Sequence, residues 1–158
     1  MTNEKNTKYH EIAVVSTRLK KLKGLKIAED KIESATMAKD LFRRQIGNMD
    51  REVFALACLD TRGRITHYSE VHIGSVNQSI IHPREVFKIA ILSNAQSILV
   101  AHNHPSGDLT PSSSDIKVTE TLIEAGKLLD IKLIDHIIVS DEKALSMRQA
   151  GSMMFEAF

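Results

Sequence analysis

Residues 97–115, SILVAHNHPSGDLTPSSSD, decide how this chain is interpreted. The first five residues, SILVA, form a short and continuously apolar run, which is typical of a strand buried on both faces. The run leads directly into a polar segment rich in proline, glycine and serine. Loops of this kind at strand ends often carry chemistry, because the rigid scaffold fixes groups that the loop leaves accessible. We therefore expect a buried strand that ends at a functional loop.

The segments around this stretch alternate between extended and helical patterns. Upstream, the patterns predict a strand, a helix, a β-hairpin and a second helix, over 11–19, 34–47, 52–74 and from Pro83 onward. Downstream, they predict a helix from Ser112 to about Asp130, a buried strand over 131–140 and a shorter strand or fraying end over 143–151. The order β-α-β-β-α-β-α-β-β predicts an α/β fold with a single mixed β-sheet sandwiched by helices.

Length and composition fit one soluble domain. The 158 residues are 42% hydrophobic, which is enough for an ordinary core. No run of about eighteen apolar residues predicts a membrane span, and the N-terminus lacks the pattern of a secretory signal. The lone Cys58 cannot form an internal disulfide. We expect a cytoplasmic protein with no membrane partner, divided into an N-terminal strand and basic loop (1–33) and a main domain (34–158).

The net charge gives no overall bias toward nucleic acid, because 21 basic and 20 acidic residues leave a formal charge of +1. One local exception is a basic cluster near the N-terminus, made of Arg18, Lys20, Lys21, Lys23 and Lys26. These side chains either contact phosphates or lie in solvent, and we favour solvent because charge runs are usually solvated. Nucleic acid is therefore a weakly supported partner.

Two histidines and an aspartate have the spacing of metal ligands. His102 and His104 are separated by one residue, and side chains at i and i+2 of an extended segment point to the same side. Asp115 falls in the first turn of the next helix, after a loop whose prolines and glycine allow it to fold back. Two imidazoles and one carboxylate leave the fourth position of a tetrahedral zinc ion to water, which is the arrangement of a catalytic site.

Part of this pattern has a simpler interpretation. Ser112 and Asp115 match the S-x-x-D form of a helix N-terminal capping box, which needs no metal. The cap leaves both histidines unexplained, whereas a metal site accounts for all of these residues together. We therefore favour one bound Zn²⁺ ion, although such a ligand set also accepts iron or manganese.

The run H-x-H, seven residues, S-x-x-D is the signature of the JAMM, or MPN-plus, metallopeptidase family, and it stands here as HNHPSGDLTPSSSD. The segments IHPREVFKIAILSNAQSILVAHNHPSGD and AGKLLDIKLIDHIIVS resemble the RadC branch of that family, and the similarity covers roughly residues 34–151. The resemblance implies a cytidine-deaminase-like α/β architecture. It also implies zinc-dependent hydrolysis of a peptide or isopeptide bond in an unidentified protein or peptide.

The resemblance further implies an acid/base glutamate from an upstream strand, and the matching position is Glu52. Glu70 and Glu85 compete for this role. Glu52 is preferred because it directly precedes an apolar strand expected at the centre of the sheet, whereas Glu85 lies where a carboxylate simply complements a helix dipole. Glu52 would pass a proton from water to the leaving amine, and the Ser112 hydroxyl would hydrogen-bond the oxyanion.

Asp135 and His136, in IDHIIV, have two interpretations that we weigh equally. They support the ligands from outside, since a ligating imidazole normally gives its other N–H to a carboxylate or carbonyl, or they form a hydrogen-bonded pair at a strand end. His67, His72 and His82 are interpreted as ordinary polar residues.

The resemblance also raises a second functional class. Proteins that resemble RadC have been named for DNA repair, so the alternative is a nucleic-acid-acting or recruitment protein with the same metal site. Full-length RadC-like proteins carry an N-terminal helix-hairpin-helix segment that binds the DNA backbone. The residues before Ser34 are too few to contain it, so we expect a short form that lacks it. A metal-free scaffold conflicts with the presence of all three ligands.

Overall fold

The structure, a computed structural model, describes residues 11–74, 81–151 and 155. The helices are α1 (Ala35–Ile46), α2 (Pro83–Leu92) and α3 (Ser113–Leu129). The strands are β1 (Val53–Leu59), β2 (Ile65–Ile73), β3 (Ser97–Asn103), β4 (Lys132–Val139) and β5 (Ala144–Ser146). Each of these elements lies where the sequence predicts one. No helix within the described ranges is long and apolar enough to cross a membrane.

The strands form one mixed sheet in the order β2-β1-β3-β4-β5. β1 is antiparallel to both β2 and β3, β3 is parallel to β4, and β4 is antiparallel to β5. β1 and β3 are buried along their whole length, as continuous apolar runs predict for central strands. The α/β class with a mixed sheet between helices is thus confirmed.

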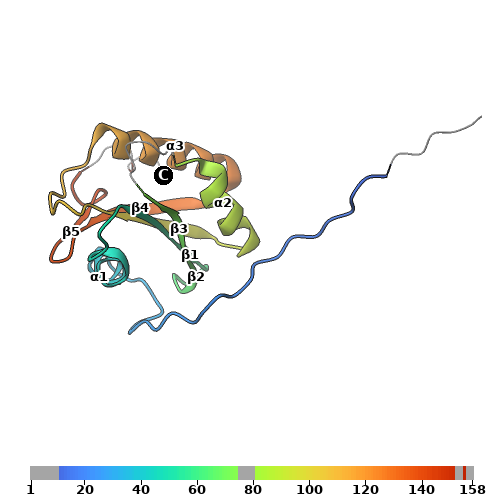
Figure 1. Cartoon of the computed structure of the whole chain (residues 1–158), viewed down its shortest axis with the longest axis horizontal. Coiled ribbons are helices and arrows are strands. Elements are labelled where there is room, and N and C mark those ends of the chain that lie inside the picture. The colour runs from blue at the N-terminus through green and yellow to red at the C-terminus, as the bar shows by residue number, and fades with distance from the viewer. Residues whose placement is uncertain (1–10, 75–80, 152–154, 156–158) are drawn as a thin grey trace, which may run out of the picture.

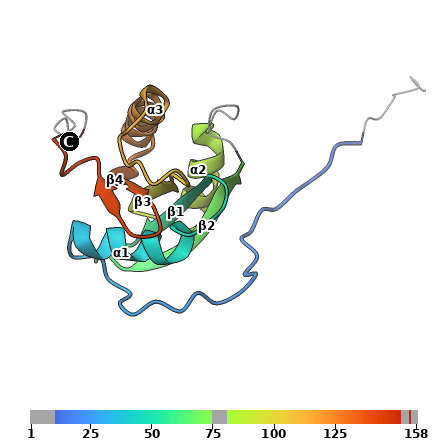
Figure 2. The same cartoon turned by 60° about the vertical axis from the view of Figure 1, so that its left-hand side comes forward.

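One face of the sheet is covered by α1, and the other by α2 and α3 (Figure 1 and Figure 2). Alternation along each strand divides the core between these faces. On β3, Val100 belongs to the cluster under α2 and α3, whereas Ala101 belongs to the cluster under α1. The same alternation places His102 on the α3 face and Asn103 on the α1 face.

The pairing of β4 with β3 contains a β-bulge. Ile98 pairs with Leu133, but the next residue of β3 pairs with Asp135, so β4 has one extra residue at this point. An extra residue reverses the faces to which the following side chains point. Beyond the bulge, His136 therefore shares the α3 face of the sheet with His102.

α1 is bounded by the residues that the sequence predicts. Ser34 Oγ accepts a hydrogen bond from Met37 N at 3.3 Å, and the helix ends at Gly47. Gly47 has a φ of −61°, which any residue adopts. However, a Cβ atom at Gly47 would lie 2.5 Å from the carbonyl oxygens of both Arg43 and Ser140. Glycine is therefore needed here for the close approach of α1 to the turn after β4.

The strand predicted over 11–19 is wrong. Residues 11–27 have no regular secondary structure, and the first part of this segment extends away from the domain (Figure 1), whereas Ile27 at its end packs against the core under α1. The side chains of Ile12, Val14 and Val15 are 83%, 98% and 79% exposed. β-branched residues form a strand where a neighbouring strand accepts their backbone hydrogen bonds and their apolar face is covered, and this segment has neither within the described part of the chain. The basic cluster lies on the same segment and is exposed, as the solvated interpretation predicts.

Candidate metal centre

Three side chains converge at the carboxyl end of β3. His102 belongs to β3, His104 follows the strand directly, and Asp115 lies in the first turn of α3. The Nε2 atoms of the two histidines are 2.9 Å apart. Asp115 Oδ1 lies 3.1 Å from His102 Nε2, and Asp115 Oδ2 lies 3.6 Å from His104 Nε2. The fold thus brings together the three residues that the sequence singles out.

The separations between these atoms suit a divalent cation. All three groups offer ligand atoms that lie within 4.8 Å of one another. Two atoms that are each about 2.1 Å from a tetrahedral zinc ion lie about 3.4 Å apart, which is close to the separations seen here. His102 and Asp115 are buried, whereas His104 is partly exposed. The site is therefore enclosed on the side of the sheet and accessible from the side of His104.

The contacts among these groups shift two pKa values. Burial opposes ionisation of Asp115, but its contacts with His102 and His104 outweigh burial and hold the pKa of the carboxyl well below its ordinary value. The contact with Asp115 raises the pKa of His104 above its ordinary value. Partial burial opposes this second shift, whereas the Asp108 carbonyl and the charge of Glu52 add to it. Asp115 is therefore ionised at neutral pH, as a metal ligand must be.

Asp115 also forms the helix cap that the sequence offered as the alternative. Ser112 Oγ accepts a hydrogen bond from Asp115 N at 3.1 Å, and Asp115 Oδ2 accepts one from Ser112 N at 2.7 Å. The cap and the contact with His102 are compatible because they use different oxygens of the carboxylate. Since the Ser112 hydroxyl is an acceptor in the cap, its own hydrogen can point outward from this exposed residue.

Each imidazole is also held through its other ring nitrogen. His104 Nδ1 lies 2.6 Å from the Asp108 carbonyl oxygen. A carbonyl oxygen only accepts, so neutral His104 carries its hydrogen on Nδ1 and presents the lone pair of Nε2 to the site. His102 Nδ1 lies 2.8 Å from His136 Nε2. Both rings are therefore fixed in orientation by partners outside the group of three.

The two neighbouring residues of IDHIIV have different surroundings. His136 is fully buried against His102, and burial lowers its pKa well below the ordinary value. Asp135 instead accepts hydrogen bonds from the Ser146 hydroxyl and, at 3.1 Å, from Arg148 N. Asp135 therefore ties β4 to β5 and to the segment after it, and His136 is the member of the pair that contacts a histidine of the site.

Glu52 lies directly before β1, on the same side of the sheet end as His104. Phe54 pairs with His102 across β1 and β3, so Glu52, two residues earlier, comes opposite His104. The electrostatic effect of Glu52 on His104 agrees with this placement.

The two competing glutamates lie elsewhere in the fold. Glu85 accepts a hydrogen bond from Lys88 Nζ at 2.7 Å at the start of α2. Glu70 lies on the edge strand β2, opposite Ala55. Of the three candidates, Glu52 is the one that the sheet register brings to the histidines.

Asn103, between the two histidines, was not singled out from the sequence. It is fully buried, and its side chain points to the opposite face from His102. Asn103 Oδ1 accepts a hydrogen bond from Val53 N at 2.7 Å, and its Nδ2 donates to the carbonyls of Met49 and Arg51 at 3.2 and 3.1 Å. These bonds hold the chain on both sides of Glu52. The sequence signal that could have singled out Asn103 is a polar residue at a position where the alternation along β3 predicts a buried apolar one.

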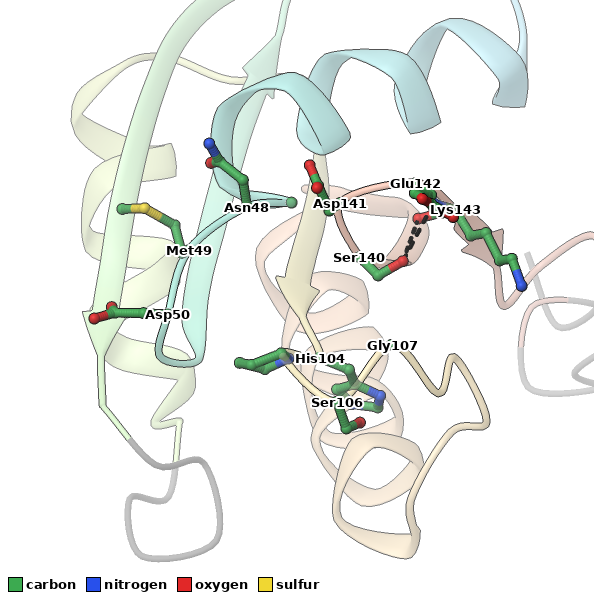
Figure 3. Close-up of a pocket in the computed structure, with 12 residues that line it drawn as sticks. Asn48, Met49, Asp50, His104, Ser106, Gly107, Ser140, Asp141, Glu142 and Lys143 are labelled. Atoms are coloured by element: carbon green, nitrogen blue, oxygen red, sulfur yellow. Dashed lines mark hydrogen bonds between the residues drawn. The ribbon is translucent and has the colours of Figure 1, made fainter.

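A cavity of about 590 Å³ opens beside His104. Figure 3 shows the segments that surround it, which are the loop after α1, the loop after β3 and the turn between β4 and β5. Its charged lining is mainly acidic, because Asp50, Asp141 and Glu142 lie there with Lys143. One of the three candidate ligands, His104, therefore lies in the wall of a cavity large enough for part of a substrate.

Fold and site together define an α/β domain that carries two histidines and an aspartate, arranged to bind a divalent cation, at the end of a central strand. The chain belongs to the RadC-like JAB domain family, whose model matches residues 32–152. The predicted resemblance to the RadC branch is thus confirmed, and the matched range is close to the one expected from the sequence.

Several curated relatives carry the name UPF0758 protein. One from Roseiflexus castenholzii is 46% identical over 120 residues, which cover 76% of this chain and 52% of the relative. One from Finegoldia magna is 50% identical over 110 residues, covering 70% and 49%. One from Clostridium botulinum is 39% identical over 148 residues, covering 93% and 65%. The chain therefore spans about half the length of the first two relatives and 65% of the third.

Proposed function

We propose that this domain is a zinc-dependent hydrolase that cleaves an amide bond in a peptide or isopeptide linkage. The observation that carries the proposal is the meeting of His102, His104 and Asp115 at a site whose most exposed member, His104, lines an open cavity. Two imidazoles and one carboxylate are a ligand set of catalytic zinc sites, and they leave a position for water and substrate.

The residues around the site supply the proton transfers of such a reaction. When bound, zinc provides a water with a pKa of about 7 and a Lewis acid for the scissile carbonyl. Glu52 would take one proton from the attacking water as the water oxygen bonds to the carbonyl carbon. Glu52 then delivers the proton to the leaving nitrogen as the C–N bond breaks. The products are a carboxylic acid and an amine, and Glu52 returns to its initial state.

Ser112 is suited to stabilise the charge that develops on the carbonyl oxygen. Its hydroxyl lies beside Asp115 and can donate its hydrogen outward while it accepts the cap bond from the helix. A preorganised donor of this kind is typically worth about 10²–10³ in kcat. Ser112 therefore complements Glu52, because one acts on the oxyanion and the other on the leaving group.

The cavity beside the site favours a protein or peptide over nucleic acid as the substrate. Asp50, Asp141 and Glu142 give its lining a negative balance, which repels a polyphosphate backbone. A peptide backbone is uncharged, so this lining does not repel it. A role in DNA repair with the same metal site would require contacts outside this cavity, for which the basic cluster near the N-terminus is the suitable surface.

The test is a parallel measurement of metal content and cleavage. Purified protein loaded with Zn²⁺ is incubated with a proteome-derived peptide library, and new termini are identified by mass spectrometry. Single-stranded and duplex DNA are incubated with the same preparation. His104→Ala removes a ligand, Glu52→Gln preserves the ligands but removes the acid/base group, and His67→Ala alters an exposed histidine of β2 as the matched control.

We expect the wild type and His67→Ala to bind one equivalent of zinc and to cleave peptides. Glu52→Gln should bind zinc without cleaving, and His104→Ala should do neither. Stoichiometric zinc in His104→Ala would refute the site. Cleavage of DNA together with intact peptides would refute the proposed substrate but not the metal centre.

A further inference from the structure

We propose that Thr119 is a positioning residue for the metal centre. Its hydroxyl acts through His136 and supports His102 in the neutral tautomer whose Nε2 binds a cation. This inference rests on the metal site of the proposed function and concerns how His102 is held when the ion is bound. Thr119 lies on α3, one helical turn after Asp115, and is fully buried.

A buried chain of polar atoms connects Thr119 to His102. Thr119 Oγ1 lies 2.6 Å from the Asp115 carbonyl oxygen and 2.6 Å from His136 Nδ1. His136 Nε2 lies 2.8 Å from His102 Nδ1. Met147 Sδ is also near Thr119 Oγ1, at 3.7 Å, but thioether sulfur is a weak acceptor. The carbonyl and the imidazole are thus the partners that decide the hydrogen position.

One arrangement of hydrogens satisfies this chain when His102 Nε2 holds a cation. His102 then carries its hydrogen on Nδ1 and donates it to His136 Nε2. His136 Nε2 is consequently an acceptor, so the hydrogen of His136 lies on Nδ1 and is donated to Thr119 Oγ1. The hydroxyl of Thr119 in turn donates to the Asp115 carbonyl.

The opposite tautomer of His102 would oppose metal binding. With its hydrogen on Nε2, His102 would donate to Asp115 Oδ1, which lies 3.1 Å away. That hydrogen bond would occupy both groups and would have to break before a cation could enter. In the metal-binding tautomer, the hydrogen of His136 lies on Nδ1 and the Thr119 oxygen accepts it. Without that oxygen, this buried N–H would lose its acceptor, and the metal-binding tautomer would be less stable.

The test compares Zn²⁺ dissociation constants, measured by chelator competition. Thr119→Val removes the hydroxyl at nearly constant volume, and Thr119→Ser restores it. Thr121→Val is the matched control, because Thr121 is an exposed residue of the same helix whose hydroxyl likewise donates to the carbonyl four residues earlier, at 2.8 Å. We expect Thr119→Val to bind Zn²⁺ about 10–100-fold more weakly, and Thr119→Ser and Thr121→Val to retain wild-type affinity.

A second measurement needs no variant. The ¹⁵N chemical shifts of the imidazole rings in Zn²⁺-loaded wild type should place the hydrogens of both His102 and His136 on Nδ1. A hydrogen on His136 Nε2, or wild-type Zn²⁺ affinity in Thr119→Val, would overturn the inference. If no substrate is cleaved but the expected order of affinities holds, the proposed hydrolase activity fails and the role of Thr119 stands.

Discussion

Replacing Asn103 with alanine should release the chain segment that carries Glu52. The substitution removes the acceptor of Val53 N and the donor to the carbonyls of Met49 and Arg51. A buried N–H without a partner costs about 1–3 kcal/mol, and each of the other two bonds contributes about 0.5–1.5 kcal/mol. Because the two carbonyls lie nearer to solvent and can bind water, we expect a total loss of about 2–4 kcal/mol in the free energy of unfolding.

Urea unfolding and amide hydrogen exchange measure this effect at two levels. The loss corresponds to a fall in Tm of about 2–4 °C per kcal/mol for a chain of this size. The Val53 amide should exchange at least about tenfold faster, since each 1.4 kcal/mol of local opening free energy is about a factor of ten. Asn48→Ala, an exposed asparagine of the adjoining loop, is the control and should leave both quantities unchanged.

The same substitution should separate metal binding from catalysis. Asn103 points away from the α3 face, so His102, His104 and Asp115 keep their positions and Zn²⁺ still binds. Misplacement of Glu52 by about 1 Å should lower kcat by about 10²-fold. The reasoning is refuted if Asn103→Ala retains full protection of the Val53 amide and unfolds within about 0.5 kcal/mol of the wild type.

Four further outcomes follow from the described contacts. Gly47→Ala should lower the free energy of unfolding in urea by about 1–3 kcal/mol, because the new Cβ atom meets two carbonyl oxygens. Gly24→Ala is the control and should be neutral, because nothing lies within 4 Å of a Cβ atom there, and equal effects of the two substitutions would contradict the prediction. Zn²⁺ at about 100 times its Kd should stabilise the wild type by about 2.7 kcal/mol in thermal unfolding, and an equal shift in His102→Ala would count against the site. Ser112→Ala should still bind zinc but should lose about 0.5–2 kcal/mol of stability, because the helix loses its cap. The same substitution should lower kcat by about 10²–10³-fold, and an unchanged kcat would remove Ser112 from the mechanism. Burial raises the pKa of the Cys58 thiol, so it should react with a disulfide reagent only after unfolding, and rapid reaction of the native protein would disprove its burial.

The sequence alone determined those features that depend on neighbours along the chain. The apolar run of β3 and the two-residue spacing of His102 and His104 predicted that both imidazoles point to one side. The S-x-x-D pattern placed Asp115 in the first turn of a helix. These predictions succeeded because strand alternation, helix capping and tight turns are set by interactions within a few residues.

Only the tertiary structure decided which distant residues meet at this site. The strand predicted over 11–19 failed because β-propensity needs a neighbouring strand, which local sequence does not reveal. His136 faces His102 only because a β-bulge shifts β4 by one residue, so simple alternation along β4 could not place it. The register of β1 against β3 brings Glu52 to His104, and Asn103 holds that register from the opposite face. Contacts between strands far apart in the sequence arise from sheet pairing and core packing, and these are properties of the whole fold.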